Sequence, residues 1–282
     1  MPDRDERKAL AAKHLALMRG ALASDTAATI AAATVYEDGE GRELPLPEPA
    51  FEATETSVTT AFAPAALREA HGKTAVVDPA SFTRPGGGYE DGAFGPEQVL
   101  CAESNLYPIL CGLKETYHDA NRGFQRGQLF TDRALYLPDV AFSHEGTLRK
   151  ADVIALPEPN RARALANHRS ERECDQALAK RIETLLRIAA ANGCETLVCG
   201  AFGCGREGYD EQQVIGLFQA WIEAHPGVIG HLVFAVPRAR FDAFDAAFGK
   251  PKVEEVAPVV AEEDEDEFDL ASIELPEGVT LR

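Results

Sequence analysis

Two glycine-rich loops are the segments of this 282-residue sequence whose residue types and spacing point most directly to chemistry. The first runs from Pro85 to Gly95 and the second is Gly203-Cys204-Gly205-Arg206-Glu207-Gly208. Each follows a predicted strand and precedes a predicted helix, so backbone N–H groups and the helix N-terminus can approach a pyrophosphate closely. Neither loop contains a Walker Lys-Ser/Thr pair. We therefore predict a nucleotide diphosphate held by backbone; the alternative is that these glycines only form tight turns.

The elements that must position the loops alternate along the chain. Apolar runs predict strands at 54–59, 74–78, 134–137, 140–142, 151–156, 196–201 and 231–236. Helical periodicity predicts helices at 7–22, 61–69, 99–113, 174–192, 211–224 and 240–248, with a loop at 36–53. This order predicts a three-layer α/β domain with a mixed sheet and helices on both faces. In such sheets ligands bind beyond the carboxyl ends of the strands, which is where both loops fall.

Charge and composition limit the remaining possibilities. The formal net charge is −18, from 28 Lys and Arg against 46 Asp and Glu. Residues 254–282 carry −10 of it, so we expect residues 1–252 to form one domain and 253–282 a solvated acidic tail that repels nucleic acid. No apolar run is long enough to cross a membrane and no signal-like segment begins the chain, which predicts a cytoplasmic protein. The six cysteines have no zinc spacing, so we expect neither metal nor cofactor.

The first glycine loop and the residues after it resemble a known signature. Pro85-Gly86-Gly87-Gly88, seven further residues and Pro96-Glu97-Gln98 are similar to the microbial-type poly(ADP-ribose) glycohydrolases, macrodomain proteins with a triple glycine, six to eight residues and Gln-Glu-Glu. The resemblance continues through 129–132, 135–140, 153–160 and 200–205, and the helix at 7–18 resembles the family's helical extension. It covers most of residues 5–250. It implies a macrodomain fold with ADP-ribose, or an ADP-ribosylated protein, as partner.

Carried over by position, the resemblance assigns roles to both loops. It implies that the diphosphate is held by Gly86, Gly87 and Gly88 and by Gly203, Cys204, Gly205, Arg206 and Glu207. Phe202 or Tyr209 is expected to supply an aromatic wall near the nucleotide. Asn160 is expected to line the same cleft.

The catalytic triplet departs from the family pattern. Pro96 replaces Gln, Glu97 matches the first Glu, and Gln98 stands where the family has its general acid. Arg84 stands where the family usually has Asn beside the distal ribose, and its guanidinium is suited to clamping an anion. An amide cannot replace a carboxyl in proton transfer, which typically contributes about 10²–10⁴-fold to rate.

Three functions remain open from the sequence. The first is an ADP-ribose-binding macrodomain with weak or absent hydrolysis. The second is an active glycohydrolase that uses Glu97. The third is a non-enzymatic scaffold whose acidic tail recruits a basic protein.

Overall fold

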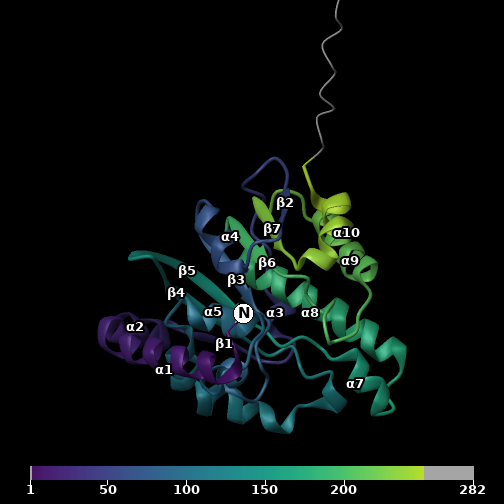
Figure 1. The fold of residues 1–282 in the computed structure, drawn as a ribbon. Helices are drawn as coiled ribbons and strands as arrows, with labels where there is room; N and C mark the ends of the chain where they lie inside the picture. The colour runs from purple at the N-terminus through teal and green to yellow at the C-terminus, as the bar shows by residue number, and fades with distance from the viewer. Residues whose placement is uncertain (1, 251–282) are drawn as a thin grey trace, which may run out of the picture. The chain divides into compact units, whose positions relative to one another are not determined.

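A seven-stranded mixed sheet forms the middle of the fold (Figure 1). The computed structural model describes residues 2–250, with strand order β1–β4–β5–β3–β6–β7–β2. The strands are β1 (Thr34–Tyr36), β2 (Glu55–Thr59), β3 (Thr74–Asp78), β4 (Ala134–His144), β5 (Thr147–Ala155), β6 (Thr196–Cys199) and β7 (His231–Ala235). Neighbouring strands from β5 to β2 pair in parallel, whereas β4 is antiparallel to β1 and β5. The predicted mixed α/β fold is confirmed.

The central strands are apolar on both faces because helices cover both. Every residue of β3 and of β6 is buried. Alternate side chains enter different cores: Val77 packs on one face with α8 (Glu171–Ala191), α9 (Glu211–Ala224) and α10 (Arg238–Phe248). Val76 packs on the other with α4 (Ala63–Glu69), α5 (Pro96–Ala102) and α6 (Leu106–Gly112). This alternation is the side-chain period of a strand buried on both sides.

The two glycine loops meet at one edge of this sheet. The first follows β3 and the second follows β6, and these strands are parallel, hydrogen-bonded neighbours. Carboxyl ends of adjacent parallel strands lie at the same edge, so the topology brings together loops that are more than 100 residues apart in sequence.

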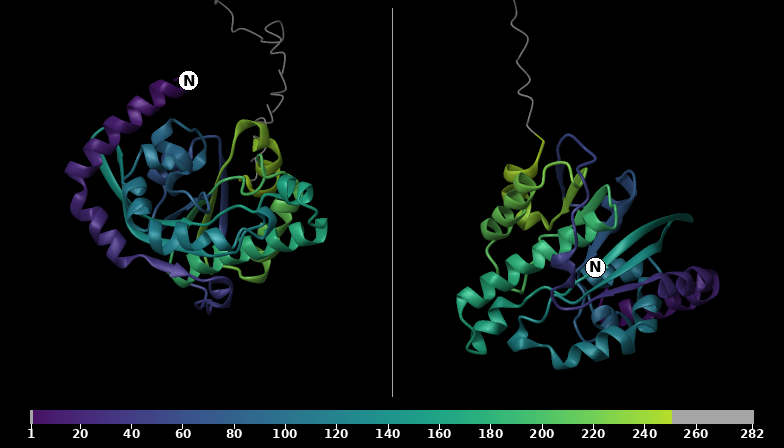
Figure 2. Two further views of the ribbon diagram at one scale, coloured as in Figure 1. Left: turned by 90° about the horizontal axis from the view of Figure 1, so that it is seen from below. Right: turned by 180° about the vertical axis from the view of Figure 1, so that it is seen from behind.

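Two N-terminal helices run along one side of the domain (Figure 2). The first, α1 (Arg4–Ala21), begins at a capping box made by Asp3 and Glu6 and buries Ala11, Leu15 and Met18. It contacts the first glycine loop, while α2 (Ala23–Ala32) packs on β4 and α6. The helix predicted at 7–22 is therefore present but starts earlier, and α2 was not predicted.

Two sequence predictions were wrong in detail. The helix predicted at 99–113 is interrupted between α5 and α6, where Ser104 Oγ donates to Leu100 O and accepts from Leu106 N. The strands predicted at 134–137 and 140–142 are one strand, β4, with a shift in register between Leu137 and Val140. The irregularity at Pro138-Asp139 is a bulge that the hairpin absorbs.

The remaining described elements are short: α3 (Glu40–Glu43), α7 (Arg161–Ala166), the 3₁₀ segments η1 (Pro85–Asp91), η3 (Ala120–Gly123) and η4 (Arg126–Gln128), and the π-helical segment η2 (Lys114–Asp119). Within residues 2–250, no helix combines the length and the apolar character needed to cross a membrane. The predicted acidic tail, 253–282, lies outside the described residues.

Candidate functional site

The first glycine loop adopts a backbone that only glycine adopts without strain. Gly86, Gly87 and Gly88 have φ of 63°, 54° and 95°, all in the left-handed region. A Cβ on Gly86 would lie 2.4 Å from the Tyr107 ring, and one on Gly87 would lie 2.5 Å from Glu97 Oε2. The triple glycine therefore permits both the turn and the close approach of the side chains below it.

Helix α1 holds the far end of this loop. Arg4 Nε donates to Asp91 O at 3.0 Å, and Arg7 Nε donates to Gly92 O at 2.9 Å. The hydroxyl of Tyr89 lies 3.0 Å from His14 Nδ1. Helix α1 thus holds the loop in place through hydrogen bonds and also packs against the core.

Glu97 and Gln98 lie directly against the glycines. They occupy the first turn of α5, which begins with Pro96 at a position where a missing N–H costs nothing. Gln98 Nε2 donates to Gly86 O at 2.9 Å and lies 3.5 Å from Glu97 Oε2. Glu97 is only 4% exposed, and its Oε2 accepts from Ser81 N at 3.1 Å.

A second buried carboxyl lies near Glu97. Asp78, the last residue of β3, is 0% exposed, and neither of its carboxyl oxygens has a hydrogen-bond partner among residues 2–250. Burial raises the pKa of Asp78 to about 8. Burial, and then the charge of Asp78, raise the pKa of Glu97 well above its ordinary value, against the N–H groups of Ser81 and Gly86. Asp78 therefore keeps its proton at neutral pH, and the surroundings of Glu97 favour its protonated form.

The second loop is fixed from below by Glu158. Its Oε1 accepts from Gly203 N at 2.6 Å, and Cys204 O accepts from Arg240 Nη2 at 3.2 Å. Burial and then the charge of Glu207 raise the pKa of Glu158 to about 8.

In the same loop Gly205 and Arg206 are exposed, and a cavity of about 400 Å³ opens beside the loop. Its lining consists of Arg161, Cys204, Gly205, Gly208, Tyr209, Asp210, Gln213 and Arg240.

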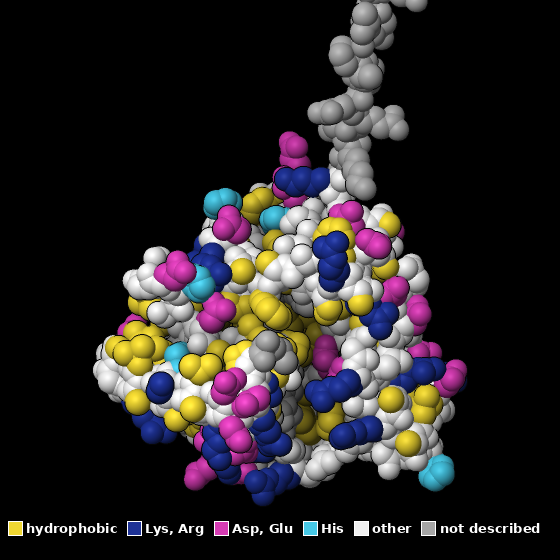
Figure 3. All heavy atoms as spheres, viewed as in Figure 1, with side chains coloured by type: hydrophobic (Ala, Val, Ile, Leu, Met, Phe, Trp, Pro, Cys, Tyr) yellow, Lys and Arg dark blue, Asp and Glu magenta, His cyan; other side chains and the backbone are white. Residues whose placement is uncertain are grey.

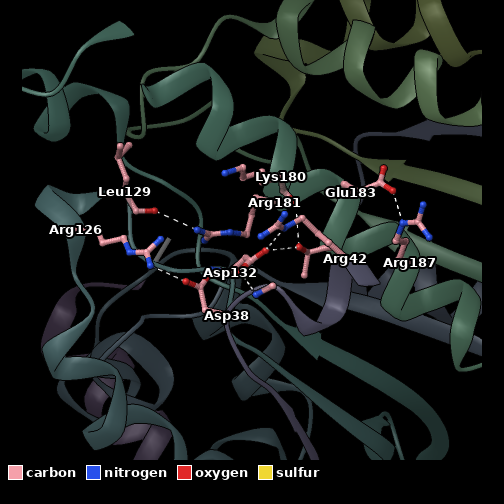
Figure 4. A network of polar contacts seen from close by, with 11 residues as sticks. Asp38, Arg42, Arg126, Leu129, Asp132, Lys180, Arg181, Glu183 and Arg187 are labelled. Carbon is pink, nitrogen blue, oxygen red and sulfur yellow. Dashed lines mark hydrogen bonds and ion pairs between the residues drawn. The ribbon is translucent and has the colours of Figure 1, made fainter. Parts of the chain in front are cut away.

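Helix α8 fixes the turn that carries Glu158. The fully buried Arg181 donates to Pro157 O and, at 3.1 Å, to Leu129 O (Figure 4). In the same network Asp132 accepts from Thr184 Oγ1 at 2.9 Å and from Arg42 Nε at 2.6 Å. Through these contacts α8 holds two segments in place: residues 129–132, and Pro157 in the turn after β5.

The structure places the other predicted site residues as follows. Arg84 is exposed and its guanidinium pairs with Asp91. Asn160 caps α7, its Oδ1 accepting from Arg163 N at 2.9 Å. Phe202 and Tyr209 are 2% and 3% exposed and belong to the core, and Tyr209 is also among the residues that line the cavity beside the second loop. The structure brings Gly86–Gly88 together with Glu97 and Gln98, and groups Gly203, Cys204, Gly205 and Glu207 on the neighbouring loop.

Asp78 and Glu158 were missed by the sequence reasoning. Each follows an apolar run, Asp78 at the end of β3 and Glu158 between two prolines after β5. An acid at the carboxyl end of a predicted strand was a visible signal. The burial of Asp78 could not be seen in the sequence, because it depends on the packing of α5, α8 and the loops over this residue.

The face that carries the loops is hollowed between α5 and α8 (Figure 3). Hydrophobic side chains line the hollow, and side chains of both charges surround it. Among residues 2–250, no group of three or more His, Cys, Asp or Glu side chains is arranged to hold a metal ion.

Comparison with known proteins agrees with this geometry. The profile described as "Microbial-type PARG, catalytic domain" matches residues 7–145. The poly(ADP-ribose) glycohydrolase from Deinococcus radiodurans, solved in complex with ADP-ribose, is 30% identical with a TM-score of 0.68; the match covers 79% of this chain and 96% of that one. This chain belongs to the microbial-type poly(ADP-ribose) glycohydrolase family.

Other solved glycohydrolases extend the likeness. The enzyme from Thermomonospora curvata is 28% identical with a TM-score of 0.76, over 87% of this chain and all of that one. The same enzyme bound to the inhibitor ADP-HPD is 29% identical, with a TM-score of 0.75 and the same coverage. Among curated protein sequences, none matches this chain at a significant level. The macrodomain-like fold of a glycohydrolase is thus shown over nearly all the described residues.

Proposed function

We propose that this chain binds ADP-ribose, or a related nucleotide diphosphate, between its two glycine loops and hydrolyses poly(ADP-ribose) weakly or not at all. The binding part is supported by the left-handed triple glycine, by the exposed Gly205 and Arg206, and by the family members solved with ADP-ribose. In this proposal the backbone N–H groups of the loops meet the diphosphate.

The observation that carries the weak-hydrolysis part is the chemistry of residue 98. Its side chain is an amide whose Nε2 donates to Gly86 O at 2.9 Å. An amide N–H is too weak an acid to protonate a leaving ribose oxygen, and the amide has no carboxylate with which to activate water. The diphosphate loops remain while the acid is missing, which favours binding over turnover.

Glu97 is the second candidate, because one observation favours it. Burial raises its pKa, which favours the protonated form that a general acid needs. Its burial and its contact with Ser81 N turn it toward the protein interior, which argues against direct proton transfer to a ribose. A third function, a scaffold whose tail binds a basic protein, rests on residues outside those described.

The deciding experiment measures ADP-ribose released per enzyme per minute from automodified polymer. We expect Gln98→Glu to raise release, because a carboxyl there faces Gly86 O and Glu97, which favours its protonated form. Adding Arg84→Asn should raise release further, and Glu97→Gln should have little effect in the native background.

The opposite pattern would assign the reaction to Glu97. Strong native turnover that is lost on Glu97→Gln and indifferent to Gln98→Glu contradicts the weak-hydrolysis proposal. Calorimetry with ADP-ribose on each folded variant separates loss of binding from loss of chemistry. Absence of ADP-ribose binding in the native protein would refute the binding proposal itself.

A further inference from the structure

The proposed diphosphate site, called the cradle below, is formed by the glycine loops 85–95 and 203–208. Asp78 lies between these two parts. It ends β3, the strand between β5 and β6, and pairs in register with Ala155. Its carbonyl accepts from Leu156 N at 3.0 Å, which joins it to the turn that leads to Glu158. Three residues later, Ser81 N–H binds Glu97. Asp78 is therefore at the junction of the segments beneath both glycine loops.

The side chain of Asp78 is isolated from water and from hydrogen bonds. It is fully buried, and no donor among residues 2–250 reaches either oxygen. An ionised carboxylate in such a place is strongly unfavourable, so the group keeps its proton. This isolation distinguishes it from Asp152 on the adjacent strand, which accepts from Asp139 N at 3.0 Å and from Tyr136 Oη.

The groups around Asp78 are mostly acids. Its charge raises the pKa of Glu97 and Cys101 of α5, of Tyr117 of η2 and of Glu158 after β5. The basic groups in this neighbourhood are Arg181 of α8, which lowers the pKa of Glu158 and Tyr117, and Arg133, which lowers the pKa of Tyr117 and pairs with Glu37. Burial lowers the pKa of His118 in η2 to about 4, so that imidazole is neutral. Ionisation of Asp78 therefore adds negative charge beside these acids, and no hydrogen-bond donor among residues 2–250 stabilises it.

Both loops depend on the carboxyls that respond to Asp78. Glu97 Oε2 lies beneath Gly87, and Glu158 Oε1 accepts from Gly203 N. A bound diphosphate adds two negative charges above these groups, and repulsion is strong where water is excluded. We propose that Asp78 is a positioning residue of the cradle and that the diphosphate binds the form of the protein in which this carboxyl carries its proton.

This inference rests on the proposed ADP-ribose binding and adds a linkage to it. If the ligand prefers the protein with Asp78 protonated, then by reciprocity ligand binding raises the pKa of Asp78. Binding near pH 8 must then draw protons from the buffer. The diphosphate of ADP-ribose does not titrate in this range, so the protons are taken up by the protein.

Titration calorimetry with ADP-ribose between pH 6.5 and 9.5 tests the proposal. For one required proton with a pKa of about 8, affinity should be about tenfold weaker at pH 9 than at pH 7. Repeating the pH 8 titration in buffers of different ionisation enthalpy should show net proton uptake.

The decisive variant is Asp78→Asn, which mimics the neutral acid and cannot ionise. We expect its affinity at pH 7 to stay within about threefold of the native value. Its loss of affinity between pH 7 and pH 9 should be clearly smaller than the native tenfold, with the remainder due to Glu158, whose pKa is also about 8. Glu48→Gln removes one exposed charge and serves as the control, with native pH dependence expected.

Three results would overturn the inference. One is native affinity that stays flat from pH 7 to pH 9 with no proton uptake, a result that needs no variant. Another is full pH dependence retained in folded Asp78→Asn, which would assign the proton to another group. No ADP-ribose binding at any pH refutes the proposed function and this inference together, whereas flat binding refutes the inference alone.

Discussion

At the scale of single residues, the hydrogen bond from Gln98 Nε2 to Gly86 O shows what the amide contributes. A carboxylate cannot donate to a carbonyl, so a Glu here would make the same contact only in its protonated form. The amide therefore secures the glycine loop at every pH, whereas an acid would secure it only while it holds its proton. The contact between residue 98 and the loop therefore does not depend on pH.

Gly205 is the residue at which the binding proposal is tested most cleanly. Its φ is not positive, and a Cβ there would meet only the end of the Glu207 side chain, at 2.9 Å. We expect Gly205→Val to abolish ADP-ribose binding by filling the space of a phosphate, with a stability change within about 0.5 kcal/mol as for other exposed sites. Calorimetry and thermal melting measure the two effects.

The matched control for this change is Gly216→Val. Gly216 is exposed on α9, and no neighbouring atom lies within 4 Å of the position that a Cβ would take, so ADP-ribose affinity should remain native. Native affinity in Gly205→Val would remove the second loop from the site. Gly87→Val is a poorer test, since its positive φ and its contact with Glu97 strain the fold directly.

Asp78 also makes stability depend on pH. Its pKa is about 8 in the folded protein, against an ordinary value of 3.8. Between these values the folded state holds a proton that the unfolded state has lost, so stability falls as pH rises from about 4 to about 8 and then levels off. We expect Asp78→Asn to raise Tm relative to the native protein by several degrees more at pH 8 than at pH 5. Parallel native and variant Tm values across this range would contradict the assignment.

At the scale of elements, α1 and the first glycine loop act as one unit. Arg4 and Arg7, about one turn apart, and His14, about two turns further along the helix, contact the loop. Gly92 completes the fit: its φ is 72°, and a Cβ there would lie 2.2 Å from Arg4 O. The geometry of the cradle is thus fixed partly by a helix outside the sheet.

Removing the arginine contacts should loosen the loop without unfolding the domain. We expect Arg4→Ala/Arg7→Ala to bind ADP-ribose up to about thirtyfold more weakly, since two hydrogen bonds of about 1 kcal/mol each hold the loop in place. Lys13→Ala/Arg19→Ala removes the same charge from the same helix away from the loop and should bind normally. Equal losses in both variants would point to a general charge effect on ligand binding.

Element prediction succeeded where the chain carries its own signals. Leu178, Ile182, Leu185 and Ala189 give α8 its helical period, and α9 matches the predicted bounds. The break between α5 and α6 escaped notice because it depends on Ser104 binding both helices. Glycines, Glu97 and Gln98 could be placed in the candidate site from sequence. Asp78 and Glu158 could not, since only the packing of distant segments buries Asp78 and brings Glu158 to Gly203 N.

At the scale of the whole molecule, the acidic segment can be tested by deletion. Removing residues 254–282 changes the formal net charge from −18 to −8, because the segment carries eleven acids and Arg282. We expect Tm to move by no more than a few degrees and the protein to elute earlier from an anion exchanger. A drop of many degrees would show that the apolar residues of this segment stabilise the domain.

The pairing of β2 with β7 also determines when the domain can finish folding. Residues 55–59 form the edge strand, yet their partners are residues 231–235, which are synthesised some 170 residues later. A chain still emerging from the ribosome must keep β2 unpaired until almost the entire domain has been made. Contacts of such long sequence separation slow folding, because the ends of a large loop must be brought together first. Completion of the sheet is therefore a late step in folding, because β2 can pair with β7 only after residues 231–235 have been synthesised.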